Sequence, residues 1–262
     1  MIYYFSGTGN TRWAVEQLAR LTHDRTASIP DVLRQARRGA IIPPLVPNEP
    51  LGLAFPVHAW GPPRIVEEFI KHLIVNGGTH YTYFFCTCGD DVGQTHRFIR
   101  KQLHRQGIYL NAGFSMRLPN TYVCLPGFDI DNPSTEHHKL VHAHNRLGYI
   151  AHCINHRIHR VFRLRHGILP NTKSYVLRPL FRHLLTGDKP FHTTAECIAC
   201  GLCVRTCPLQ NITLDNGHPR WHGHCTDCLA CYHICPQHAI RYGKRTNHKG
   251  QYHMGEKGEN DE

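Results

Sequence analysis

Short apolar runs alternate with segments of helical periodicity over roughly the first 120 residues of the chain. The first run, residues 2–5, is aromatic and β-favouring, and it predicts a buried strand. Similar runs predict a weak second strand near residues 27–29 and three further strands at residues 51–57, 81–87 and 109–118. Strand patterns that alternate with helical patterns in this way are typical of an α/β domain.

Apolar positions spaced three and four residues apart predict the helices between these strands. The first helix has Trp13 and Leu18 on its apolar face. The second begins at Pro63, since proline suits the first turn of a helix, and a third covers about residues 94–106. Residues 40–50 contain four prolines and are predicted to form a loop.

A longer helical pattern extends from Leu140 to Phe162, with histidines and arginines crowded on its polar face. Several of these histidines lie four residues apart, a spacing that can hold a metal ion on one face of a helix. A basic amphipathic helix can also lie on an anionic membrane. No acidic third ligand accompanies the histidines, and we expect the apolar stripe to pack on its own domain.

The segment between the first strand and the first helix reads Ser-Gly-Thr-Gly-Asn-Thr. A strand, a loop of glycines and hydroxyls, and a helix start together predict an anion site, because exposed N–H groups and the helix dipole favour a phosphate. A P-loop would need Gly-Lys before the threonine, and a dinucleotide fingerprint would need glycine in place of Arg12. A tight turn with an ordinary helix cap is the alternative. The candidate phosphate-binding residues are Ser6, Gly7, Thr8, Gly9, Asn10 and Thr11.

This loop resembles the FMN-phosphate loop of the flavodoxins, normally [ST]-x-T-G-x-T. The resemblance implies a flavodoxin-like, doubly wound parallel sheet of strand order 2-1-3-4-5, with FMN beyond the carboxyl ends of the strands. In flavodoxins the loops after the third and fourth strands flank the isoalloxazine ring, which makes Trp60 the candidate for stacking on it. Asp90 and Asp91, in the second loop, are expected to cap the next helix. The alternative is that their charge lies close to the flavin and shifts its redox balance. That loop has no aromatic residue, so the expected ring contacts there are backbone groups of Thr87, Cys88 and Gly89.

Eight of the twelve cysteines form two runs of the pattern C-x2-C-x2-C-x3-C-P. The second run repeats the first at a constant offset of 28 residues, from Cys197 to Cys225, so a whole unit has been duplicated. The runs resemble those of bacterial two-cluster ferredoxins, in which the fourth cysteine of each run binds the other cubic iron–sulfur cluster. The resemblance implies one [4Fe–4S] cluster on Cys197, Cys200, Cys203 and Cys235, and a second on Cys207, Cys225, Cys228 and Cys231.

Structural zinc is the alternative for these runs, since C-x2-C pairs also bind tetrahedral zinc. Zinc knuckles usually take two cysteines from one turn and two ligands from a distant one, and they have no use for three cysteines followed by x3-C-P. A disulfide framework is disfavoured because nothing marks the chain as secreted. The other four cysteines have no metal-binding spacing and are interpreted as ordinary thiols: Cys86, Cys88, Cys124 and Cys153.

The formal net charge of +11 suggests a nucleic-acid binder at first sight. Cluster thiolates and a flavin phosphate would offset part of this charge, so we expect no nucleic-acid partner. The remaining basic charge suits an acidic redox protein as partner, and a homodimer is left open. The N-terminus lacks the features of a signal peptide, and no stretch approaches 18 apolar residues. We therefore expect a cytoplasmic protein without a transmembrane segment.

Together the motifs predict a flavodoxin-like domain at residues 1–165, a linker at 166–190, a small α+β two-cluster ferredoxin domain at 191–245 and a tail at 246–262. This combination resembles the flavodoxin–ferredoxin fusion proteins of anaerobic bacteria, often described as EFR-family ferredoxins. The resemblance implies electron transfer between two [4Fe–4S] clusters and FMN within one chain, in either direction. The alternative is an FMN-dependent reductase that uses the clusters to reduce a small organic acceptor. No catalytic residue is identified, and His58 is the single nearby candidate for an acid.

Overall fold

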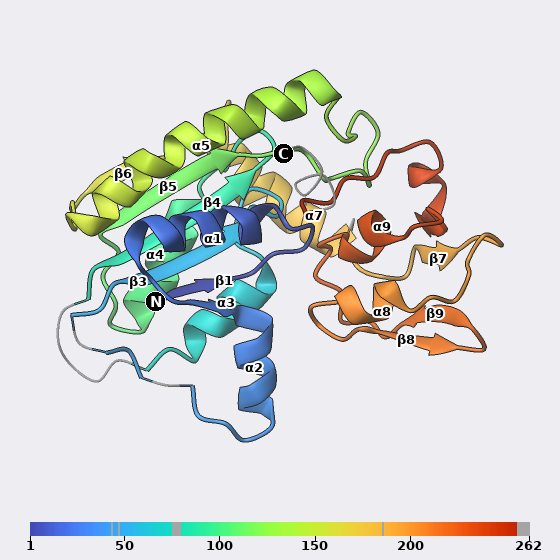
Figure 1. Cartoon of the computed structure of the whole chain (residues 1–262), viewed down its shortest axis with the longest axis horizontal. Coiled ribbons are helices and arrows are strands. Elements are labelled where there is room, and N and C mark those ends of the chain that lie inside the picture. The colour runs from blue at the N-terminus through green and yellow to red at the C-terminus, as the bar shows by residue number, and fades with distance from the viewer. Residues whose placement is uncertain (43, 47, 75–79, 185, 256–262) are drawn as a thin grey trace.

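The fold is described by a computed structural model for residues 1–42, 44–46, 48–74, 80–184 and 186–255. The N-terminal part is built on a six-stranded parallel sheet of order β2-β1-β3-β4-β5-β6 (Figure 1). The central strands are almost wholly buried, as is typical of a parallel sheet with helices on both faces. The strands are β1 Ile2–Tyr4, β2 Thr26–Ser28, β3 Leu51–Pro56, β4 Thr82–Cys88, β5 Ala112–Arg117 and β6 Val161–Arg163.

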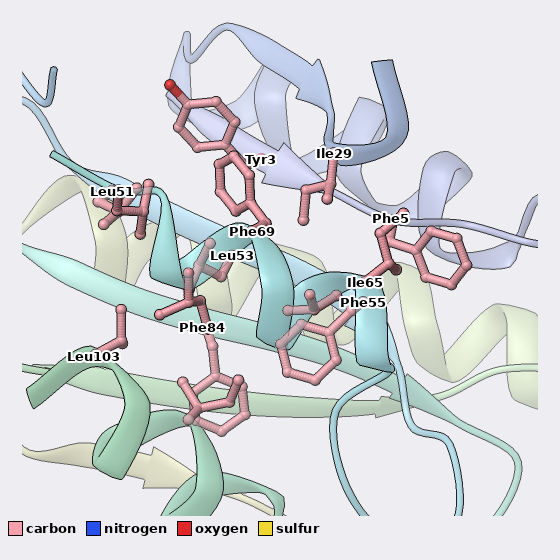
Figure 2. Close-up of a cluster of buried hydrophobic side chains, with 14 of the residues drawn as sticks. Tyr3, Phe5, Ile29, Leu51, Leu53, Phe55, Ile65, Phe69, Phe84 and Leu103 are labelled. Carbon is pink, nitrogen blue, oxygen red and sulfur yellow. The ribbon is translucent and has the colours of Figure 1, made fainter. Parts of the chain in front are cut away.

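Helices cover both faces of this sheet. On one face α1 packs beside α5, and Leu18 and Leu147 lie in the same buried cluster. On the other face α2, α3 and α4 enclose a second cluster, in which the rings of Tyr3 and Phe69 are 4.8 Å apart (Figure 2). These helices are α1 Asn10–Thr22, α2 Ile29–Arg37, α3 Arg64–Lys71, α4 Thr95–Arg105 and α5 Pro133–Asn155.

The predicted strand order 2-1-3-4-5 is confirmed, and β6 is an additional strand beside β5. The prediction of a helix as far as Phe162 is wrong at its C-terminal end, because α5 ends at Asn155 and Val161 lies in β6. The chain turns between these two elements at Arg157 and Arg160, whose left-handed backbones have φ of 47° and 59°. β6 then pairs in parallel along the edge of β5.

The predicted linker is largely helical. It contains α6 Pro170–Thr172, a π-helical turn η1 at Lys173–Leu177, and α7 Arg178–Leu184. Residue 185, which follows α7, lies outside the described residues. Across the described residues, no helix is both long and apolar enough to cross a membrane.

The cysteine-rich region folds into a small α+β domain beside the carboxyl edge of the parallel sheet (Figure 1). Its helices α8 Leu202–Thr206 and α9 Ala230–Ile234 repeat the 28-residue offset of the cysteine runs. Phe191 and Tyr232 belong to a third buried cluster, which also includes Val123 and Cys124 from the loop after β5. Its other elements are β7 Phe191–Thr193, β8 Ile212–Asp215, β9 His218–Trp221, β10 Ile240–Tyr242 and the 3-10 turn η2 Gly243–Thr246. The strands form two antiparallel pairs, β7 with β10 and β8 with β9. The predicted tail is described only as far as residue 255.

Candidate functional site

A cavity of about 420 Å³ lies beyond the carboxyl ends of β1, β3, β4 and β5. The loops that follow these four strands form one side of it. The other side is formed by the cysteine-rich loop at residues 226–229 and by Lys173, Arg178, Phe181, Arg182 and Thr186. Ten residues were predicted to contact a flavin, and all of them except Gly9 line this cavity. The nine are Ser6, Gly7, Thr8, Asn10, Thr11, Trp60, Thr87, Cys88 and Gly89.

The loop before α1 has two glycines against which the C-terminal domain packs. A Cβ atom on Gly7 would come within 2.7 Å of the carbonyl oxygen of Cys228. Gly9 is the N-cap of α1 with φ of 90°, and a Cβ there would lie 2.4 Å from the carbonyl oxygen of Met254. The Met254 amide also donates to the Thr8 carbonyl oxygen at 2.9 Å. The cysteine-rich loop and the C-terminal segment therefore both contact the candidate phosphate loop.

Several side chains of this loop have partners within the protein. The Asn10 side-chain amide donates to the Pro119 carbonyl oxygen at 2.9 Å, and the Thr11 and Thr87 hydroxyls lie 2.8 Å apart. The Ser6 hydroxyl accepts from the Arg12 amide at 3.2 Å. The first-turn amides of α1 have no partner within the helix, as at any helix start. The donor set thus fits a phosphate mainly through backbone N–H groups and the Thr8 hydroxyl.

The Trp60 loop has an unusual backbone that the helical segment after β6 holds in place. Ala59 and Trp60 both have positive φ, at 46° and 56°. The Ser174 hydroxyl donates to the Trp60 carbonyl oxygen at 3.0 Å and accepts from the Gln94 amide at 2.8 Å. Lys173 places its ammonium 5.8 Å from the centre of the Trp60 indole ring. Ser174 therefore links the two loops that were predicted to flank a flavin ring.

Ion pairs attach the same helical segment to the sheet domain. Arg178 donates to the Pro62 carbonyl oxygen at 2.7 Å and to Glu67 at 3.0 Å, and burial lowers the pKa of its guanidinium. Lys173 pairs with Asp91 at 2.5 Å. Asp91 was expected to cap α4, but the N-cap is Gln94, and Asp91 instead accepts from the Gly93 amide in the preceding turn. The sequence offered no sign of these contacts, since Arg178 and Glu67 are 111 residues apart.

His58 lies in the cavity wall between the two domains. Its burial disfavours the charged imidazolium and lowers its pKa to about 4, although a hydrogen bond to the Thr226 backbone acts in the opposite direction. The imidazole is therefore neutral at pH 7, with Arg178 and Arg182 also disfavouring its charge.

The eight clustered cysteines gather around two small cavities. One is lined by Cys207, Cys225, Cys228 and Cys231, and the other by Cys197, Cys200, Cys203 and Cys235. Each cavity thus takes three cysteines from one run and the fourth from the other. Soft thiolates in this number are the donors that a cubic iron–sulfur cluster requires. Within the described part of the chain, no three His, Cys, Asp or Glu side chains converge closely enough to hold a single metal ion.

Backbone amides point at some of these sulfur atoms. The amides of Asn211, Asp227 and Ala239 lie 3.3 Å from the sulfurs of Cys207, Cys225 and Cys235 respectively. Such N–H···S contacts stabilise charge on cluster sulfurs and ligands, and they raise the reduction potential. The donor set and its surroundings therefore both fit iron–sulfur clusters.

The two cysteine cavities differ in their surroundings. Cys228 lines both its own cavity and the large cavity, together with its neighbour Leu229, which is 4% exposed. In the other run Cys200 is exposed, and the side chain of Ile198 beside it is 60% exposed. One cysteine cavity therefore adjoins the large cavity, and the other has an exposed loop.

The remaining cysteines lie outside these cavities or at the rim of the large one. Burial raises the pKa of Cys88 and of Cys124 to about 12, and it raises that of Cys86 well above its usual range. These groups are therefore uncharged thiols at pH 7, as expected for ordinary buried cysteines.

Comparison with known proteins identifies the C-terminal domain. Residues 196–240 match the family model described as a 4Fe-4S dicluster domain. The chain is 39% identical over 67 residues to a ferredoxin of Pyrobaculum islandicum, a match that covers 22% of this chain and 62% of that ferredoxin.

Among solved structures, a putative flavoprotein from Bacteroides uniformis is 19% identical, over 45% of this chain and 88% of its own, with a TM-score of 0.36. The Trp repressor binding protein from Bacillus subtilis is 14% identical, over 55% of this chain and 95% of its own, with a TM-score of 0.32. The observed strand order and the dicluster match agree with a flavodoxin-like domain joined to a 4Fe-4S ferredoxin domain, the organisation of a flavodoxin–ferredoxin fusion.

Proposed function

We propose that this chain is an electron-transfer protein that holds FMN in the large cavity and a [4Fe–4S] cluster in each cysteine cavity. The observation that carries the proposal is the position of Cys228, which lies in the wall of the large cavity and of one cysteine cavity. Electron transfer needs neighbouring redox groups with little solvent between them, and this shared wall supports such an arrangement.

The residues of the chain have distinct roles in this proposal. The loop at residues 6–11 holds the phosphate through backbone amides, and Trp60 stacks on the ring, with Thr87, Cys88 and Gly89 along its edge. The eight cavity cysteines bind the clusters in the crossed arrangement. When bound, clusters carry single electrons and a flavin accepts or releases one or two.

The state of His58 favours a carrier over a reductase of organic substrates. Reduction of an organic acceptor at a flavin usually needs a proton donor close to the ring. His58 is half-buried, and desolvation lowers its pKa to about 4, which leaves it neutral at pH 7. It is therefore a poor general acid, and the carrier function is the one that the site supports best.

A redox protein is the partner that this proposal requires. Residues Ile198, Ala199 and Cys200 form an exposed loop of the cysteine-rich domain, with Ile198 60% exposed. An apolar side chain next to an exposed cluster ligand suits short-lived contact with another electron carrier. The excess of basic residues over the chain favours an acidic one.

Anaerobic purification with iron, sulfide and flavin quantified tests the proposal. We expect about eight irons per chain and one FMN. Replacement of the loop at residues 6–11 should abolish flavin binding and keep the iron. Cys228→Ala should lower the iron content by about half, whereas the matched variant Cys153→Ala, at a buried cysteine outside the three cavities, should leave it unchanged. Zinc in place of iron would overturn the assignment.

A further inference from the structure

Two histidines on the exposed face of α5 have their ring nitrogens directed at each other. His138 and His142 are exposed and lie four residues apart, one turn along the helix. Their Nε2 atoms are 3.1 Å apart, and the ring centres are 4.3 Å apart. A hydrogen bond at this distance requires one nitrogen to offer its lone pair to the N–H of the other. Two imidazole nitrogens this close together can also bind the same metal ion.

We propose that His138 and His142 form a binding site for a late first-row divalent cation such as Zn²⁺. Zinc–imidazole bonds of about 2.0–2.1 Å place neighbouring ligand nitrogens about 3.0 Å apart in octahedral and about 3.3 Å apart in tetrahedral geometry. The observed separation of 3.1 Å lies between these values. On binding, the cation takes the place of the hydrogen between the two nitrogens. The donor ring moves its proton from Nε2 to Nδ1, so that both rings offer an Nε2 lone pair to the cation.

The positive side chains nearest in sequence are engaged elsewhere. Lys139 follows His138 but is buried, and its ammonium lies 2.5 Å from Asp131. Arg146, one turn after His142, donates to the carbonyl oxygens of Ser115 and Arg163 at 2.6 and 2.8 Å. These contacts turn both charges toward the body of the domain, so neither side chain occupies the space in front of the histidines.

The site has two protein ligands and open positions. Among the residues that the structure describes, no third His, Cys, Asp or Glu joins the pair. Water or another molecule therefore completes the coordination. Imidazole nitrogen favours zinc, nickel and copper over magnesium and calcium, which prefer oxygen.

A second histidine pair, formed by His152 and the C-cap residue His156 at the end of the same helix, provides an internal comparison. His152 and His156 are also exposed and four residues apart, with ring centres 4.2 Å apart. The Nδ1 atom of His156, however, lies 2.9 Å from the carbonyl oxygen of His152, as expected of a bond to the backbone. This pair has the same spacing without two nitrogens directed at each other, which makes it a matched control.

The proposed site is separate from the candidate redox sites. In the described structure, no residue of α5 lines the large cavity or either cysteine cavity. α5 packs on the sheet through other positions, including Ala143 and Leu147. Its test therefore does not depend on whether the chain binds FMN or iron.

Residue-resolved acylation of histidines by diethyl pyrocarbonate tests the site, because a metal-bound ring nitrogen does not react. The full chain, purified anaerobically, is titrated with Zn²⁺ and the modified residues are located by mass spectrometry. We expect His138 and His142 to become protected together, with one midpoint, at zinc concentrations that leave His152 and His156 reactive. His142→Ala should raise the midpoint for His138 by about tenfold to a hundredfold, since a single imidazole loses the chelate effect. His156→Ala should leave that midpoint unchanged.

Two results would overturn the proposal: protection of His138 in His142→Ala at the same zinc concentration as in the unaltered chain, or equal protection of the His152 pair. A stoichiometry of one zinc per two chains would support the site and assign its open positions to a second copy. Both substituted side chains are exposed, so the variants should fold, and unchanged iron content checks that they do.

Discussion

Gly7 is the residue at which the cysteine-rich loop approaches the candidate phosphate loop most closely. A Cβ on Gly7 would lie 2.7 Å from the carbonyl oxygen of Cys228 and 2.8 Å from the Cβ of Cys228. Neither of these Cys228 atoms can move away unless the backbone of the cysteine-rich loop moves with it. We expect Gly7→Ala to destabilise the protein by about 1–3 kcal/mol, and to weaken FMN binding in a fluorescence-quenching titration. Gly148→Ala is the control, because a Cβ atom at this position of α5 would meet no other atom within 4 Å. Alanine should stabilise the helix there. Equal thermal stability of the two variants would contradict this interpretation of Gly7.

His58 gives the stability a predictable dependence on pH. Its pKa is about 4 in the folded chain, below the usual 6.5. The unfolded chain therefore binds a proton that the folded chain does not, and stability is lost as the pH falls from 6.5 towards 4. Between about pH 7.5 and about pH 5.5 the loss due to this group should be about 1 kcal/mol.

The measurement for His58 is the pH dependence of the thermal unfolding midpoint, by circular dichroism, over that same interval. His58→Gln should show a weaker dependence than the unaltered chain. His152→Gln, at an exposed position, should match the unaltered chain. A His58→Gln profile parallel to that of the unaltered chain would show that the imidazole is not kept neutral by burial.

At the scale of elements, the helical segment Pro170–Leu184 connects loops that are distant in sequence. Ser174 is 1% exposed and bonds to both Trp60 and Gln94. We expect Ser174→Ala to destabilise the protein by about 1–3 kcal/mol, because the part-buried Trp60 carbonyl and the buried Gln94 amide lose their partner. Hydrogen exchange should become faster in residues 58–61 and 93–95. Thr172→Ala, at an exposed position of the same segment, should change neither loop. Unchanged exchange in Ser174→Ala would mean that the loops hold their conformation unaided.

The elements that sequence analysis located are those whose signal is local. The buried strands and the cysteine runs are encoded by neighbouring residues, and β3 and β4 were found close to their observed bounds. β6 was missed because Ile158, Val161 and Phe162 continue the three- and four-residue spacing of α5. The left-handed turn at Arg157 and Arg160 has no sequence signal, since neither is glycine or asparagine.

The candidate site was likewise only half visible in the sequence. The phosphate loop, Trp60 and the crossed cysteine sets follow from motifs, and the structure places all of these residues except Gly9 in the walls of three cavities. The contacts of Gly7 with Cys228 and of Ser174 with Trp60 join residues more than 100 positions apart. Pairings of this kind depend on how whole elements pack, and no motif encodes them.

At the scale of the whole molecule, the segment that ends near Met254 returns to the candidate phosphate loop, more than 240 residues earlier in the chain. Figure 1 shows the red C-terminal part of the chain running from the cysteine-rich domain back towards the sheet domain. After β10 the chain crosses back over the cysteine-rich domain, where the Tyr252 amide donates to His233 at 3.1 Å. The Gly250 amide donates to Asp129 of the sheet domain at 3.0 Å. The C-terminal segment therefore connects the two domains and then reaches Thr8.

This connection predicts that a change near the C-terminus alters flavin binding nearly 250 residues away. Met254→Pro removes the amide that donates to the Thr8 carbonyl oxygen at 2.9 Å, while Met254→Leu keeps it. Loss of one such hydrogen bond costs about 1 kcal/mol, which should raise the FMN dissociation constant about fivefold. Met254→Leu should bind FMN as the unaltered chain does, and iron content should stay constant in both variants. Equal FMN affinity of the proline and leucine variants would show that the phosphate loop keeps its shape without the C-terminal segment, and that the cysteine-rich loop alone supports it.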